Sequence, residues 1–234
     1  MSIYKPEEWQ TIMSDVNTII LPGITHFQSP RFNAYFPANS FFPAQLAEML
    51  SNCFNPIGFN WINSPALTEL ETVMMDWLVQ LLGLPVQFSS STLGGGCIQG
   101  TASEATLVAV LVAREKALAH SKCSIDVLVC YTSDQAHSSF KKAFKLAGIL
   151  PQNIRILETE LGKHSLTYNA LKEAIDQDLQ KGLVPFFIGA TIGTTSATHF
   201  DRLDKIGPLC KEYNISMHVD AACKCLDIFM FFLA

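Results

Sequence analysis

Apolar stretches alternate with helical patterns along the second half of the chain. Three apolar stretches lack the alternation of apolar and polar residues that marks a strand with one solvent-exposed face. Such stretches are typical of strands in a parallel sheet that is covered on both faces. They are residues 125–131, 184–192 and 215–219. Patterns with helical spacing accompany them over residues 138–147, 168–180 and 202–213. This order predicts an α/β fold with a mostly parallel sheet flanked by helices.

The first half contains one clear helix. Apolar residues recur at helical spacing over residues 67–81, and Ser64 and Pro65 suit the start of that helix. Glu69 and Glu71 suit the positive end of its dipole. A glycine and a proline follow and end the pattern.

Two further segments frame that helix. A second helix is predicted over residues 101–117, where good helix formers follow a run of glycines. Residues 22–59 are rich in aromatics and prolines and are predicted to be irregular. Loops with so much apolar surface usually line a cleft or an interface.

Composition and charge narrow the class of protein. Of the 234 residues, 49% are hydrophobic and 16% charged, which excludes a disordered chain. No repeat or linker divides the chain, so residues 1–234 are expected to form one domain. The net charge is −5 and no basic cluster forms, so nucleic-acid binding is not expected.

Seven scattered cysteines lack the paired spacing of a zinc site, so no metal is expected. They indicate reduced, mostly buried thiols in a cytoplasmic protein. Residues 1–10 lack the apolar run of a secretion signal. The apolar residues 226–234 are far fewer than the ~20 that span a bilayer, so no membrane anchor is expected.

Four segments carry candidate chemistry. Residues 94–104 read GGGCIQGTASE, and glycines before a helix N-terminus favour a bound anion. The segment lacks the third glycine of a Rossmann fingerprint and the lysine of a P-loop, and it also fits a tight loop before a structural helix. His137, in SDQAHSS, could stack on a planar ligand, transfer protons or cap a helix.

The other two segments follow the later strands. Residues 190–196 read ATIGTTS and fit either a site or an ordinary turn. Asp220, in HVDAA, is a carboxylate that needs a cation or donors, which a ligand, a helix cap or a loop salt bridge could supply. Together the four segments fit an aromatic ring with a phosphate arm and a basic nitrogen. Such ligands bind outside the carboxyl ends of parallel strands.

These motifs resemble those of the group II pyridoxal 5′-phosphate (PLP) dependent amino-acid decarboxylases, a family that includes aromatic-L-amino-acid, tyrosine, tryptophan and histidine decarboxylases and plant aldehyde synthases. The matching segments are residues 94–106, 133–139, 190–195 and 218–222, extended by residues 22–26 and 64–78. The resemblance reaches Ala222 and implies the large domain of the fold type I PLP-dependent transferases, in an incomplete form.

The resemblance also implies roles for individual residues. The cofactor-binding residues would be Ala102, Ser103, His137, Thr195, Asp220 and Ala222. Of these, the first two contact the phosphate, Asp220 pairs with the pyridine nitrogen, and His137 stacks on the ring as the catalytic residue. Thr195 positions the ring and Ala222 packs behind it. The substrate-binding residues would be Tyr35, Phe36 and Pro37, with Ala38 where the family usually has threonine.

By the same resemblance, three regions that the proteins of this family carry are expected to be absent from this chain. They are the N-terminal segment that swaps across the dimer, the Asn-x-His-Lys region with its Schiff-base lysine, and the small C-terminal domain. Lys224 is too close to Asp220 to replace that lysine on the opposite side of the ring. The chain by itself is therefore predicted to be inactive.

The family's complete form implies a cytoplasmic homodimer that decarboxylates aromatic L-amino acids to amines or aldehydes. Two alternatives remain open. One is a non-enzymatic truncated isoform or fragment that binds PLP weakly or pairs with a full-length subunit. The other is an unrelated nucleotide-binding α/β protein.

Overall fold

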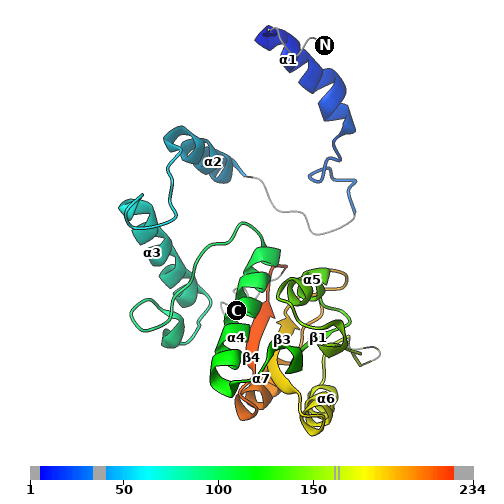
Figure 1. The fold of residues 1–234 in the computed structure, drawn as a ribbon. Coiled ribbons are helices and arrows are strands. Elements are labelled where there is room, and N and C mark those ends of the chain that lie inside the picture. Colours follow the sequence, from blue (N-terminus) through cyan, green and yellow to red (C-terminus); the bar gives the residue numbers. More distant parts are fainter. Residues whose placement is uncertain (1–5, 34–40, 161, 163, 224–234) are drawn as a thin grey trace. The chain divides into compact units, whose positions relative to one another are not determined.

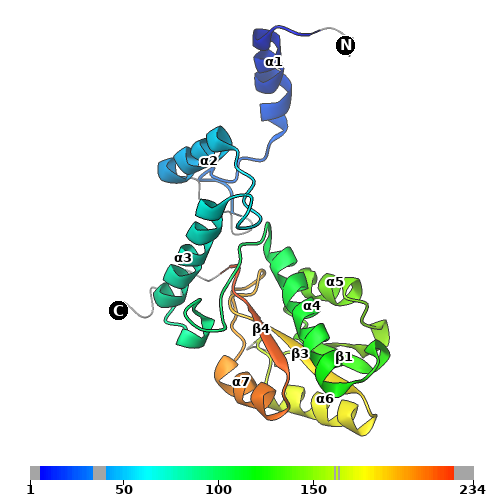
Figure 2. The same cartoon turned by 60° about the vertical axis from the view of Figure 1, so that its left-hand side comes forward.

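The computed structural model describes residues 6–33, 41–160, 162 and 164–223. The chain divides into two compact units, Met1–Asn52 and Cys53–Ala234. Figure 1 and Figure 2 show both units, and the sheet lies in the second. The single domain expected for residues 1–234 stays a prediction.

The described N-terminal residues contain several helical elements. Helix α1 (Trp9–Asp15) continues into the π-helical turn η1 (Val16–Ile20) and the 3₁₀ turn η2 (Leu21–Gly23), and helix α2 (Phe42–Phe54) follows. None of these four elements contains a buried residue.

The irregular conformation predicted for residues 22–59 is wrong over α2. There Phe42, Leu46 and Met49 recur at helical spacing, and no proline interrupts the segment after its first turn. The aromatic content of the surrounding residues obscured that pattern.

Helix α3 (Pro65–Leu81) confirms the predicted helix and its start at Ser64 and Pro65. Ser64 occupies the N-cap without a side-chain capping bond, and no acidic residue lies in the first turn. Glu71 instead accepts a hydrogen bond from the backbone N–H of Ile98 at 2.7 Å. That bond ties α3 to the loop before the next helix.

Helix α4 (Ala102–Ser121) begins where predicted and runs four residues beyond residue 117. Thr101 is its N-cap, and the Thr101 hydroxyl accepts a bond from the N–H of Glu104 at 3.1 Å. Such a bond satisfies one of the N–H groups that a helix start leaves without a partner.

The sheet has four parallel strands: β1 (Leu128–Ser133), β2 (Ile154–Leu157), β3 (Val184–Thr191) and β4 (Ser216–Asp220). Their order in space is β2-β1-β3-β4. The three predicted strands are confirmed, although the first begins later because residues 125–127 form a 3₁₀ turn. Strand β2 was not predicted, since it is only four residues long and includes Arg155.

Helices cover both faces of the sheet (Figure 1, Figure 2). Helices α4 and α5 (Ser138–Leu146) pack on one face, and α6 (Tyr168–Gln180) and α7 (Leu203–Glu212) on the other. Within β1, Leu128 and Cys130 belong to the first core, and Val129 and Tyr131 to the second. All four are buried, which explains why the strand lacks polar alternation.

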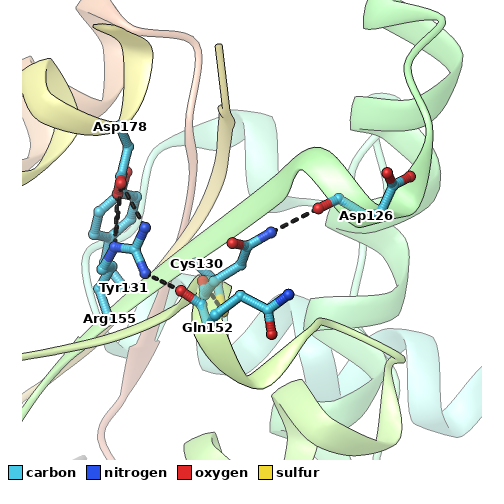
Figure 3. A network of polar contacts seen from close by, with 7 residues as sticks. Asp126, Cys130, Tyr131, Gln152, Arg155 and Asp178 are labelled. Carbon is cyan, nitrogen blue, oxygen red and sulfur yellow. Dashed lines mark hydrogen bonds and ion pairs between the residues drawn. The ribbon is translucent and has the colours of Figure 1, made fainter. Parts of the chain in front are cut away.

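A buried ion pair joins α6 to the edge of the sheet. The Asp178 carboxylate, 1% exposed, receives Nη2 of Arg155 at 2.5 Å and the phenol O–H of Tyr131 at 3.0 Å. Figure 3 shows the three side chains together, with Arg155 also donating to the carbonyl of Gln152. Burial raises the pKa of the Tyr131 phenol, so Tyr131 stays a donor to this carboxylate.

The prediction of mostly buried cysteines is wrong for the described part of the chain. Cys130 and Cys210 are buried, Cys123 and Cys223 are partly exposed, and two more, at positions 53 and 97, are exposed. All six described cysteines are free thiols. The exposed ones lie on segments whose apolar residues are also exposed.

None of the helices in the described part of the chain has the length and hydropathy that a membrane-spanning helix needs.

Candidate active site

The strand order determines where a ligand can bind. From β1 the chain crosses to β2 on one side, and later to β3 and β4 on the other. The loops after β1 and β3 therefore diverge at the carboxyl edge of the sheet, which is the usual ligand site of such folds. A cavity of about 230 Å³ lies at this edge.

All six residues predicted to bind a cofactor line this one cavity. They are Ala102, Ser103, His137, Thr195, Asp220 and Ala222. Ser139, Thr191, Gly193 and Cys223 line it as well. Three of these four fall in segments that the sequence singled out, but no role was assigned to them. Binding by any of these residues stays a prediction.

Two helices begin at the cavity. Ala102 and Ser103 are the first residues of α4, so their N–H groups precede the first possible intrahelical bond. His137 is the N-cap of α5. Both helix dipoles present their positive ends to the cavity, which favours an anion there.

The packing of two glycines in this run fits the tight-loop alternative. A Cβ on Gly94 would collide with the carbonyl of Gln87, and one on Gly96 would lie 3.1 Å from the sulfur of Met75. Neither glycine lines the cavity. The glycines allow close packing of the loop, and the start of α4 supplies the groups that face the cavity.

His137 caps α5 through its ring. Its Nδ1 accepts the backbone N–H of Ser139 at 3.2 Å and lies 3.0 Å from the Ser139 hydroxyl. A nitrogen that accepts an N–H bond carries no proton, so the proton of the neutral ring is on Nε2. His137 therefore both caps α5 and lines the cavity.

Asp220 ends β4 beside Thr191, its partner in the neighbouring strand. One Asp220 carboxylate oxygen accepts the N–H of Ala222 at 3.0 Å. Among the described residues, no lysine or arginine forms an ion pair with Asp220. The carboxylate is partly buried and retains bonding capacity toward the cavity.

The loop after β3 is held closed by backbone bonds. Gly193, at φ +79°, and Thr194 both donate their N–H groups to the carbonyl of His199, at 2.9 and 3.0 Å. The His199 N–H returns a bond to the Thr194 hydroxyl at 3.0 Å. This closed loop leaves Thr195 exposed at the cavity.

A buried carboxylate supports the same loop. Asp201, 5% exposed, accepts the N–H groups of Leu166 and Thr191, both at 2.8 Å. Burial raises the pKa of this carboxyl group. Asp201 therefore fixes the end of β3 without lining the cavity itself.

Some predicted residues cannot be placed. Tyr35, Phe36 and Pro37, predicted to bind substrate, lie outside the described residues, as do Ala38 and Lys224. Among the described residues that line the cavity there is no lysine.

Comparison with known proteins gives one consistent result. Residues 2–226 match the family model described as "Pyridoxal-dependent decarboxylase conserved domain". The chain is 48% identical over 220 residues to tryptophan decarboxylase 2 of Oryza sativa subsp. japonica, covering 93% of this chain and 44% of the relative. It is also 48% identical over 219 residues to phenylacetaldehyde synthase of Arabidopsis thaliana, covering 93% of this chain and 45% of the relative.

The fold is similar to that of a solved relative. The crystal structure of Catharanthus roseus tryptophan decarboxylase, in complex with L-tryptophan, superposes with a TM-score of 0.93 at 43% identity. The match covers 99% of this chain and 51% of that one. The chain spans about half the length of the relatives it matches.

Proposed function

Since the chain belongs to the pyridoxal-dependent decarboxylase family, we propose that it forms the PLP-binding part of an enzyme that decarboxylates aromatic L-amino acids. The observation that carries the proposal is the meeting of the six predicted residues at one cavity, although they come from four separate segments. Tryptophan in the names of two relatives supports an aromatic substrate.

The groups at the cavity fit the chemistry of PLP. The starts of α4 and α5 suit a phosphate, and the Asp220 carboxylate suits a protonated ring nitrogen. When bound, PLP supplies an electron-poor ring that accepts electron density from the Cα of an amino acid as CO₂ leaves. Asp220 serves that chemistry by holding a proton on the ring nitrogen.

His137 is proposed to act through Nε2. The bonds at Nδ1 fix both the ring orientation and the tautomer, so Nε2–H is the donor that remains for a bound molecule. From this position His137 can cover a flat ring, orient a substrate carboxylate or donate a proton. The stacking role follows the family resemblance, and the donor role follows the hydrogen bonds.

Two features of the whole enzyme are part of the proposal. The product is an amine or an aldehyde, because relatives of both kinds are about equally similar to the chain. A cytoplasmic homodimer is proposed from the family resemblance. No contact with nucleic acid or membrane is included in the proposed function.

Titration of the 234-residue chain with PLP tests the proposal. A second titration uses 4′-deoxypyridoxine 5′-phosphate, which keeps the phosphate and the ring nitrogen but has no aldehyde to react with surface lysines. We expect one molecule of either ligand per chain. Asp220→Asn should weaken binding about 10- to 100-fold, because it removes a charged hydrogen-bond partner.

Asp134→Asn is the matched control. It removes the same charge at the same edge of the sheet, but Asp134 is exposed and does not line the cavity. Equal affinity in the wild type and Asp220→Asn, or binding that disappears when the aldehyde is removed, would contradict the proposed site.

A subunit-pairing role is a second candidate, favoured by apolar surface on α3. Leu70, Met74 and Trp77 are 53%, 41% and 61% exposed and recur at helical spacing. Size-exclusion chromatography with light scattering, alone and with a full-length relative, tests this role. Replacing Trp77 by glutamate should abolish pairing. A wild-type chain that is monomeric and does not bind the full-length relative would exclude the pairing role.

A further inference from the structure

We propose that Thr191 is a further binding residue of this cavity, and that its hydroxyl donates a hydrogen bond to an oxygen of the bound molecule. Thr191 is the last residue of β3 and lines the cavity. The inference rests on the proposed function, because it takes the bound molecule to be a pyridoxal phosphate.

The first observation is an unsatisfied hydroxyl. Thr191 is 3% exposed, and its Oγ has no hydrogen-bond partner among the described residues. A buried hydroxyl without a partner destabilises a fold, so native proteins keep few of them. Those that persist call for a specific explanation, such as a ligand that supplies the missing partner.

The second observation is position. Thr191 is in register with Asp220, and alternation along β3 places both on the side of the sheet that α5 covers. A molecule that pairs with Asp220 therefore lies within reach of the Thr191 side chain. The backbone N–H of Thr191 is held by Asp201 at 2.8 Å, which fixes the residue in place.

Two neighbouring threonine hydroxyls at this edge of the sheet form hydrogen bonds within the fold, in contrast to that of Thr191. Thr132 donates its hydroxyl to the carbonyl of Gly189 at 3.0 Å, and the Thr194 hydroxyl accepts the N–H of His199 at 3.0 Å. Both serve the fold and neither lines the cavity. Ser133 also has an unpaired hydroxyl, but it does not line the cavity either. Thr191 alone among these four combines an unpaired hydroxyl with a place at the cavity.

The test compares Thr191→Val and Thr191→Ser with the wild-type chain. Valine keeps the shape of threonine and removes the hydroxyl, whereas serine keeps the hydroxyl. Each chain is melted without ligand and then titrated calorimetrically with 4′-deoxypyridoxine 5′-phosphate, which avoids reaction with lysines. Thr132→Val serves as the control for loss of a structural hydroxyl.

The proposal predicts opposite effects on the fold and on binding. Thr191→Val should melt at the wild-type temperature or higher, since it removes an unsatisfied polar group. It should bind the probe about 10- to 100-fold more weakly, while Thr191→Ser stays close to the wild type. Thr132→Val should melt earlier and keep the wild-type affinity.

Two results would overturn the inference. One is a Thr191→Val chain that binds the probe as tightly as the wild type, which leaves the proposed function intact. The other is a Thr191→Val chain that melts at a lower temperature than the wild type, as Thr132→Val should. That result would mean that the Thr191 hydroxyl stabilises the fold. A wild-type chain that does not bind the probe contradicts the proposed function and this inference together.

Discussion

Asp201 shows how one buried side chain positions the end of a strand. Its two carboxylate oxygens accept the N–H groups of Leu166 and Thr191, from segments 25 residues apart along the chain (191 − 166 = 25). Such a bridge needs two acceptors at one residue. An amide in its place would offer only one acceptor and would turn a donor toward the other N–H group.

Asp201→Asn should therefore lower the free energy of unfolding by about 1 to 3 kcal/mol, the usual effect of leaving a buried donor without a partner. Urea unfolding measures this change. The exposed carboxylate of Asp134 provides the control, and Asp134→Asn should change stability by less than about 0.5 kcal/mol. Equal stability of Asp201→Asn and the wild type would contradict the bridging role.

His218 gives the chain a pH-dependent stability. The centroid of its ring is 6.3 Å from that of Phe187, in a stacked arrangement, and 5.9 Å from that of Phe140, in an edge-on arrangement. Burial lowers the pKa of His218 below 6.5, although the charge of Asp220 acts in the opposite direction. The folded chain therefore binds a proton at His218 less readily than the unfolded chain does.

The free energy of unfolding should consequently fall as the pH is lowered below about 6.5, until the folded-state pKa is passed. His218→Phe should make this dependence shallower. Urea unfolding of both chains at a series of pH values between 5 and 8 (roughly the range in which histidine titrates) measures the difference. Parallel curves for the two chains would show that His218 is not the group responsible.

Packing of β3 against α5 depends on the absence of a side chain at Gly189. A Cβ there would collide with the ring of Phe140, which is fully buried. Gly189→Ala should destabilise the chain by about 1 to 3 kcal/mol in thermal or urea unfolding, as overpacking does. Gly207 in α7 is the contrasting case, with only Met217 Cε within 4 Å.

Gly207→Ala should change stability by less than about 0.5 kcal/mol, because the helix preference of alanine is offset by its position before Pro208. A similar change in both variants would mean that the contact with Phe140 does not limit the packing of this sheet.

The ion pair between β2 and α6 should behave as a unit. Asp178→Ala should cost about 3 to 5 kcal/mol, since it removes the carboxylate that neutralises Arg155 and that accepts the Tyr131 hydroxyl. Tyr131→Phe should cost less, because the carboxylate keeps Arg155. The Arg155→Met, Asp178→Leu double variant should lose less stability than the sum of its two single variants. Additive losses would indicate that the two charges do not interact.

For the whole molecule, the sequence predicted the parts that rest on strong local patterns. The long apolar runs became β1, β3 and β4, and residues 168–180 became α6 with the predicted bounds. That residues following β1, β3 and β4 meet at one edge of the parallel sheet was predictable for the same reason. The roles of the individual residues came from the family resemblance and stay predictions.

Other features depend on contacts that the local sequence does not reveal. Strand β2 is stabilised by its pairing with β1 and by the hydrogen bond from Arg155 to Asp178, two residues that are 23 positions apart in the sequence. The glycines before α4 are required by Gln87 and Met75, which pack against them from other elements. The unpaired hydroxyl of Thr191 became evident only once its burial and its partners were known.

The most direct test of the central claim is the protonation state of the ring nitrogen in the bound ligand. ¹⁵N NMR of ring-labelled 4′-deoxypyridoxine 5′-phosphate would report it, at a pH where the free ligand has lost that proton. A carboxylate at Asp220 predicts that the nitrogen stays protonated on the wild-type chain and loses its proton on Asp220→Asn. An unprotonated nitrogen on the wild-type chain, or the same spectrum for both chains, would contradict the proposed site.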